Sequence, residues 1–218
     1  MVRTAIASCL AVLLAWAAAA WLTHDFRVFT AEGARRIEVR DNPVQAPPVE
    51  VAGPEIDAVD LAALLKEHGG PTIVDFVYTR CVSVCAALGS GFQQLQGRIA
   101  AGNAAAGPGN ASVRLLSVSF DPTHDDVAAL ARYARELRAD PGIWRFVTVA
   151  DAGALERLLR AFRVVVIPDG FAGYEHNAAL LVVDADAHLV RVFDYDELDE
   201  ALYFARSMPP AKLARAER

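Results

Sequence analysis

Residues 72–85 read TIVDFVYTRCVSVC, an apolar run that leads into two cysteines four positions apart. The run from Thr72 to Tyr78 is short and rich in β-branched and aromatic residues, which predicts a buried strand. Helical periodicity then extends from Val84 to Ile99 and predicts a helix directly after the strand. A buried strand that feeds a helix indicates a strand–helix–strand unit with a parallel neighbouring strand.

The same alternation continues toward the C-terminus. Further strands are expected over 113–120, 144–149, 177–183 and 188–193, and further helices over 123–137, 152–162 and 196–207. Residues 102–109 read as a loop, and Thr123 is the expected N-cap of its helix. The last two strands form a hairpin, so we expect a mixed α/β sheet with helices on both faces. The order βαβαβαββα is that of a thioredoxin-like fold.

Composition and charge exclude several classes of protein. Of 218 residues, 54% are hydrophobic and 22% are charged, which excludes a disordered or collagen-like chain. The formal net charge of −6 lacks the basic footprint that phosphate backbones require, so no nucleic-acid partner is expected. Three cysteines are too few for a secreted domain built on disulfides.

The N-terminal segment is apolar enough to cross a membrane once. Ala5 to Leu22 carries no charge, and as a helix it would span roughly 27 Å, close to the ~30 Å hydrocarbon core. Residues 1–22 are therefore predicted to be a transmembrane anchor or, because small residues fill 17–20, a cleaved signal peptide. Arg3 lies on the N-terminal flank, which predicts export of the remainder. We expect a bacterial inner-membrane protein whose domain lies on the periplasmic side.

The remainder divides into three predicted parts. Residues 23–53 are proline-rich and lack a sustained apolar period, which predicts a linker. Residues 54–208 are predicted to form the thioredoxin-like domain, and 209–218 a C-terminal tail. A domain of this size buries about 70% of its unfolded surface and so can hold one real core.

Cys81 and Cys85 form the first candidate site. Cys81 lies at the predicted strand end and Cys85 one helical turn later, so their sulfurs can converge at the carboxyl edge of the sheet. The helix N-terminus and Arg80 should lower the thiol pKa and favour thiolate. Thiolates serve both soft-metal binding and disulfide exchange. Disulfide oxidoreductases have a two-residue gap, so the three-residue gap here favours a metal.

A histidine would complete a three-coordinate Cys2His site that accepts Cu(I) or Cu(II). His176 directly precedes the predicted hairpin, and in this fold the loop entering that strand packs beside the end of the first strand. We therefore take His176 as the third metal ligand. His124, at the start of a predicted helix, is the second candidate.

Three stretches together resemble the Sco/SenC family of copper proteins: 74–85 with its two cysteines, 117–125 (SVSFDPTHD) and 174–176 (YEH). The resemblance covers about three quarters of the chain. It implies a thioredoxin-like copper protein that takes part in assembling the dinuclear copper centre of cytochrome c oxidase. It also implies that Cys81, Cys85 and His176 bind the copper.

The sequence departs from the family pattern at three positions. The family usually has proline after the first cysteine and often after the second, where this chain has Val82 and Ala86. Glu175 stands where aspartate is common. These changes leave the predicted ligands intact and bear on loop stiffness, copper affinity and the choice of client.

Three acids are supporting candidates. Asp75 lies six residues before Cys81 within the apolar strand, and a buried carboxylate must stay neutral or find a partner. It is expected to relay protons to the thiols, to be a partnered structural acid, or to point to a solvated face. Asp121 and Asp125 follow the second strand, where they would orient His176, contact a client, or serve only as turn and cap residues.

Three functions remain open at this point. The first is an anchored copper metallochaperone that passes copper to a cytochrome c oxidase subunit by ligand exchange. The second is a thiol:disulfide oxidoreductase in which Cys81 and Cys85 form the redox pair, supplied by a thiol-disulfide reductant. Oxidation of this pair would abolish the metal site, so one protein could do both. The third and weakest is a peroxidase of the same fold.

Overall fold

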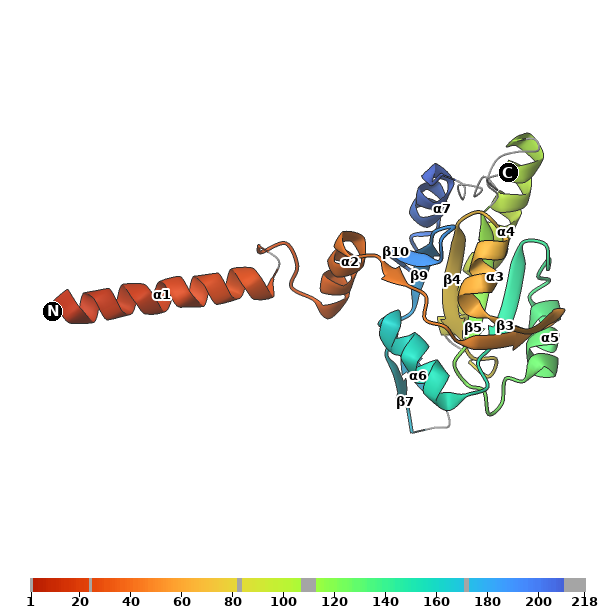
Figure 1. Cartoon of the computed structure of the whole chain (residues 1–218), viewed down its shortest axis with the longest axis horizontal. Helices are drawn as coiled ribbons and strands as arrows, with labels where there is room; N and C mark the ends of the chain where they lie inside the picture. Colours follow the sequence, from red (N-terminus) through yellow and green to blue (C-terminus); the bar gives the residue numbers. More distant parts are fainter. Residues whose placement is uncertain (1, 24, 82–83, 107–112, 171–172, 210–218) are drawn as a thin grey trace, which may run out of the picture.

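The structure, a computed structural model, describes residues 2–23, 25–81, 84–106, 113–170 and 173–209 (Figure 1). Side chains are described over the same ranges except at 84–88 and 103–106. The helices are α1 (Val2–Leu22), α2 (Ala31–Asp41), α3 (Leu61–Glu67), α4 (Val84–Ala106), α5 (Val127–Glu136), α6 (Ala152–Ala161) and α7 (Leu198–Ser207). The strands are β1 (Val44–Gln45), β2 (Glu50–Gly53), β3 (Ile56–Asp60), β4 (Thr72–Val77), β5 (Arg114–Ser119), β6 (Trp144–Thr148), β7 (Val166–Pro168), β8 (Tyr174–His176), β9 (Ala179–Val183) and β10 (His188–Asp194).

Eight of these strands form one mixed sheet in the order β1-β10-β9-β4-β5-β6-β2-β3. The central strands β4, β5 and β6 are parallel, as the predicted strand–helix–strand units require. The β9–β10 hairpin adds its strands antiparallel, with β9 next to β4. β7 and β8 pair with each other in a separate two-stranded sheet. The prediction of a thioredoxin-like mixed α/β fold is confirmed.

The sheet has a hydrophobic core on each face because side chains alternate along the buried strands. Ile73 of β4 points into the core built with α4, α5 and α7. Val74, its neighbour, points into the opposite core, built with α2, α3 and α6. Both residues are at most 1% exposed, so β4 is covered on both faces. The loop after β4 therefore starts from a rigid strand.

The segment expected as a linker contains regular structure. Residues 31–41 form α2, 44–45 form β1, and 50–53 form β2, which pairs with β6 in the main sheet. Val39 and Val51 of this segment are 1% exposed and belong to the core. The strands are too short for a sustained apolar period, which is why the sequence pattern does not reveal them.

Two helix boundaries also differ from expectation. α4 continues to Ala106 through the first part of the predicted loop 102–109, whose last residues lie outside the described ranges. α5 begins at Val127, and its N-cap is Asp126, whose carboxylate accepts a hydrogen bond from the backbone of Ala129. Thr123 is not the cap because its hydroxyl is bonded to Asp121 at 2.6 Å.

α1 is the one helix in the described residues that is long and apolar enough to cross a membrane. It has 21 residues, and its most apolar 18-residue window has a mean hydropathy of 2.1. None of its side chains is buried, and it projects from the rest of the molecule (Figure 1). A signal sequence has the same length and composition, so both predictions for residues 1–22 stay open.

Candidate metal centre

Cys81 and Cys85 lie at the carboxyl end of β4, as the spacing predicts. The backbone amide of Cys81 donates to the carbonyl of Tyr78 at 3.2 Å, which makes a tight turn directly after the strand. The Cys81 side chain is half-buried and packs against the core cluster on the α6 side of the sheet. Cys85 is the second residue of α4, and its side chain lies outside the described set.

The loop leading to Cys81 is fixed by a buried carboxylate. Asp125 accepts hydrogen bonds from the Thr79 backbone amide at 3.0 Å and from the Thr79 hydroxyl at 2.6 Å. It also accepts one from the Ser119 hydroxyl at 2.6 Å. Asp125 is fully buried, so three donors compensate its lost hydration. Its role is to hold the cysteine loop, and its described contacts do not include His176.

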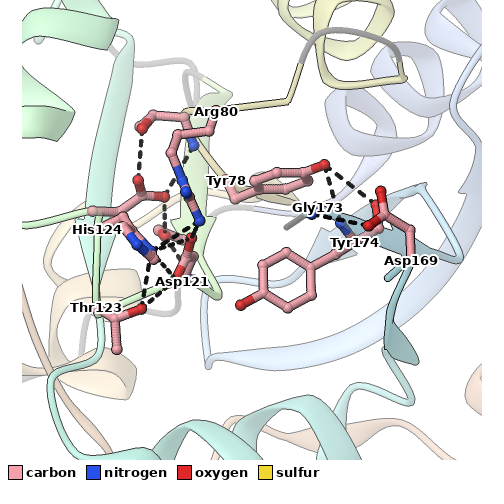
Figure 2. A network of polar contacts seen from close by, with 11 residues as sticks. Tyr78, Arg80, Asp121, Thr123, His124, Asp169, Gly173 and Tyr174 are labelled. Carbon is pink, nitrogen blue, oxygen red and sulfur yellow. Dashed lines mark hydrogen bonds and ion pairs between the residues drawn. The ribbon is translucent and has the colours of Figure 1, made fainter. Parts of the chain in front are cut away.

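A second carboxylate, Asp121, organises the neighbouring surface (Figure 2). The Arg80 guanidinium donates to it at 3.0 Å, and Nδ1 of His124 lies 2.9 Å from both carboxylate oxygens. The Thr123 hydroxyl donates at 2.6 Å. Burial alone would raise the pKa of Asp121, but the hydrogen bonds from these three neighbours outweigh it and lower the pKa.

This network bears on three expectations from the sequence. The sequence predicts that the charge of Arg80 acts on the thiols, whereas its guanidinium is ion-paired with the buried Asp121 at 3.0 Å. His124, the second candidate ligand, uses Nδ1 to contact Asp121. Asp121 contacts Arg80, in the loop before Cys81, and also His124. Its described contacts do not include His176, which it was a candidate to orient.

His176 is the last residue of β8, where it pairs with Val166 of β7. The sequence places it in a loop, whereas the structure places it in this small hairpin. Its imidazole is largely buried, and burial lowers its pKa. The ring is therefore neutral at neutral pH, which is the form that binds metals.

An aromatic cluster joins His176 to the cysteine loop. We define it as Tyr78, Phe120, Tyr174 and His176. The ring of Phe120 lies 5.1 Å from the ring of His176 and 5.3 Å from that of Tyr78, centroid to centroid. Tyr174 packs edge-on against both Tyr78 at 5.3 Å and Phe120 at 5.6 Å. The ends of β4, β5 and β8 thus meet at one point.

The sequence pattern does not predict that this cluster positions His176. The only signal is that Tyr78 and Phe120 are aromatic residues immediately after two buried parallel strands. Parallel strands end at the same sheet edge, so such residues are neighbours. What the sequence does not show is that the β7–β8 hairpin folds back onto them.

Asp75 lies deep in the sheet rather than at its edge. It is 1% exposed, and it stands opposite Ser117 in the parallel register of β4 and β5. Ser117 in turn accepts a hydrogen bond from Nε1 of Trp144 at 2.9 Å. Burial raises the pKa of Asp75 to about 7, although a hydrogen bond from Ser117 opposes the shift.

The donor chemistry suits a soft metal. Thiolate sulfur and neutral imidazole nitrogen are the ligands that copper prefers, and both residue types lie at this sheet edge. Among the described side chains, no three His, Cys, Asp or Glu residues are placed so as to hold a metal ion. The predicted set includes the side chain of Cys85, which is outside that description.

Comparison of the sequence with known proteins identifies a relative. An SCO1 protein homolog of Bacillus subtilis is 25% identical over 133 residues, which are 60% of this chain and 64% of that protein. The match therefore spans less than two thirds of the relative's length.

Solved structures share the fold. Copper-bound ScoI of Bradyrhizobium japonicum is 22% identical, with a TM-score of 0.59, over 74% of this chain and 98% of that chain. BsSco, a Sco-family cytochrome c oxidase assembly protein with a disulfide switch, is 21% identical, with a TM-score of 0.59, over 77% of this chain and 96% of that chain. Residues 64–206 match the SCO1/SenC family model. The chain belongs to the SCO1/SenC family.

Proposed function

We propose that the protein is a membrane-anchored copper metallochaperone that binds copper through Cys81, Cys85 and His176. The observation that carries the proposal is the contact of Phe120 with both Tyr78 and His176. It holds the imidazole at the same sheet edge as the loop with the cysteines. The copper-bound ScoI structure of a relative supports copper as the cargo.

Copper transfer would proceed by ligand exchange. His176 is neutral and bound by one nitrogen, so it is the easiest of the three ligands to displace. A thiolate of the acceptor would replace His176 first, and further acceptor ligands would then replace the two cysteines. No electron is transferred in these steps, so the copper keeps its oxidation state.

The proposed acceptor is a copper-binding cytochrome c oxidase subunit, because the BsSco relative is a cytochrome c oxidase assembly protein. α1 would anchor the chain in the bacterial inner membrane, with the domain on the periplasmic side. A thiol-disulfide reductant would keep Cys81 and Cys85 reduced, since an oxidised pair cannot bind copper.

The proposal is tested by titrating the full chain, in detergent and with its thiols reduced, with Cu(II). We expect one copper per chain and a thiolate-to-Cu(II) charge-transfer absorption band that disappears in His176→Ala. His188→Ala, at the tip of the β9–β10 hairpin, is the matched control and should keep the band. Absence of stoichiometric copper would overturn the proposal, and loss of the band in His124→Ala instead would reassign the third ligand.

A second candidate function is thiol:disulfide exchange, favoured by Asp75. A buried carboxyl with a pKa of about 7 can take up or release a proton near neutral pH. The two thiols would give two electrons and two protons to a client disulfide, forming a Cys81–Cys85 disulfide and two client thiols. Turnover that persists in His176→Ala but stops in Cys81→Ser would support this function.

A further inference from the structure

Tyr78 is hydrogen-bonded both to the turn that carries Cys81 and to the strand that carries His176. Its backbone carbonyl accepts the amide hydrogen of Cys81 at 3.2 Å. Its hydroxyl oxygen lies 3.2 Å from the backbone nitrogen of Tyr174, from which it accepts, and 3.3 Å from the carbonyl oxygen, to which it donates (Figure 2). One residue thus joins the turn before the thiols to the strand that ends in His176.

Over the described residues, the β7–β8 hairpin forms its own sheet and is not paired with a strand of the main sheet. Besides its short connection to β9, contacts made by its own residues help to set its position relative to Cys81. A two-stranded hairpin is marginally stable on its own. Tyr78 is 5% exposed, and its hydrogen bonds to the hairpin are partly buried, which reduces competition from water.

The hairpin is shaped for this approach at Gly173. A Cβ added there would lie 3.2 Å from the Tyr78 hydroxyl and 2.5 Å from a carboxylate oxygen of Asp169. Asp169 closes the hairpin by accepting a hydrogen bond from the Gly173 amide at 2.9 Å. Glycine therefore allows the hairpin backbone to come within hydrogen-bonding distance of Tyr78.

Fixing the backbone at Tyr174 also fixes His176. The two residues are separated by one position in a strand, so their side chains point to the same face. Both rings pack against Phe120, at 5.6 Å and 5.1 Å between centroids. A shift of the Tyr174 backbone would move the imidazole with it.

We infer that Tyr78 is the positioning residue of the copper site, whose hydroxyl holds the His176 hairpin over the cysteine loop. The inference rests on the proposed function, because it assigns Tyr78 a role in copper binding through His176. It adds a residue that touches no metal. Tyr78 acts on the site through the backbone of Tyr174.

The test uses Tyr78→Phe, which removes the hydroxyl and keeps the ring that packs against Phe120. In the reduced full chain in detergent, we expect copper affinity to fall about tenfold, in line with the loss of two modest hydrogen bonds. The nitrogen hyperfine coupling of the Cu(II) electron paramagnetic resonance spectrum should also weaken. Tyr203→Phe, which alters a tyrosine that is 78% exposed on α7, is the matched control and should change neither quantity.

A double-mutant cycle separates positioning from a general loss of stability. If Tyr78 acts through His176, Tyr78→Phe lowers affinity in the wild type and has no further effect in His176→Ala. Gly173→Ala, whose added Cβ would crowd the Asp169 carboxylate as well as the Tyr78 hydroxyl, should also lower copper affinity.

Other results would separate the inference from the proposed function. Wild-type affinity in Tyr78→Phe, or an equal loss in the His176→Ala background, would overturn the inference and leave the proposed function standing. A wild-type chain that binds no copper would overturn both.

Discussion

Asp125 and Thr79 are 46 positions apart in the chain, yet the carboxylate of Asp125 binds both the backbone amide and the hydroxyl of Thr79. Thr79 lies two residues before Cys81, so the turn that precedes α5 holds the loop that carries the first cysteine. The Asp125–Thr79 contact therefore stabilises the fold and positions the loop that carries Cys81.

Asp125→Ala should be destabilising because it leaves the donors on the half-buried Thr79 and the buried Ser119 without this acceptor. We expect a loss of about 3 kcal/mol in the free energy of unfolding, together with weaker copper binding. Denaturant unfolding and copper titration measure the two effects. Asp126→Ala is the control: it removes only the α5 cap, so about 1 kcal/mol should be lost with unchanged copper affinity. Wild-type stability in Asp125→Ala would contradict the assignment.

Asp75 should make the protein less stable as the pH rises toward 8. Its pKa is about 7 in the folded state, against an ordinary value near 4, so the folded chain binds more protons between these values. Stability is therefore fully present below about pH 4 and is lost as the pH rises through 7, by a few kcal/mol in total. Asp75→Asn should remove this slope in unfolding curves measured from pH 4 to 8. Asp57→Asn, at an exposed position of β3, should keep it; an unchanged slope in Asp75→Asn would show that the carboxyl is not the cause.

Asp121 should have the opposite pH dependence. The pKa of its carboxyl is lowered in the folded state, because hydrogen bonds from three neighbours outweigh the effect of burial. It therefore contributes stability that is present above the unfolded pKa, near 4, and is lost as the pH falls through the folded value. Asp121→Asn should be less stable than the wild type at pH 7 and should lose less stability on acidification. Thermal unfolding at pH 7 and pH 3 tests this, and parallel acid losses in the two proteins would contradict it.

α2 should detach from the domain when Arg35 is replaced. Arg35 is 4% exposed, and it donates to Glu32 at 3.0 Å and to the carbonyl of Phe162 at 2.9 Å. Arg35→Met should cost about 1–3 kcal/mol and make α2 a preferred site of limited proteolysis, because a buried carbonyl loses its donor. Arg40→Met removes an exposed arginine from the same helix and should change stability by less than about 0.5 kcal/mol. Equal protease resistance of α2 in wild type and Arg35→Met would contradict the prediction.

The central part of the fold could be predicted because its local signals agree with one another. The strand from Thr72, the helix capped by Asp151 and the hairpin around residues 184–187 each combine an apolar pattern with a clear boundary residue. Such agreement between pattern and boundary makes a local prediction reliable. The cysteine pair is visible for the same reason, since it lies directly at one of these boundaries.

The rest depends on contacts between distant parts of the chain. β7 and β8 have three residues each, so no periodicity identifies them, and the sequence pattern assigns His176 to a loop. α2 has a polar surface, and its burial comes from Arg35 and Val39 meeting the domain. The hydroxyl contact of Tyr78 with the Tyr174 backbone joins residues 96 positions apart. Sequence pattern alone carries no information on such a pairing.

Because α2 packs on the domain, the segment between α1 and the domain is shorter, and the domain can move less far from α1. If residues 23–53 were all flexible, the tether could extend to roughly 110 Å, at about 3.5 Å per residue. With α2 packed on the domain, only residues 23–30 separate it from the end of α1, and they reach about 28 Å at the same length per residue. In a chain anchored by α1, a recipient would have to present its metal-binding groups close to the lipid surface, within about one domain diameter of the bilayer.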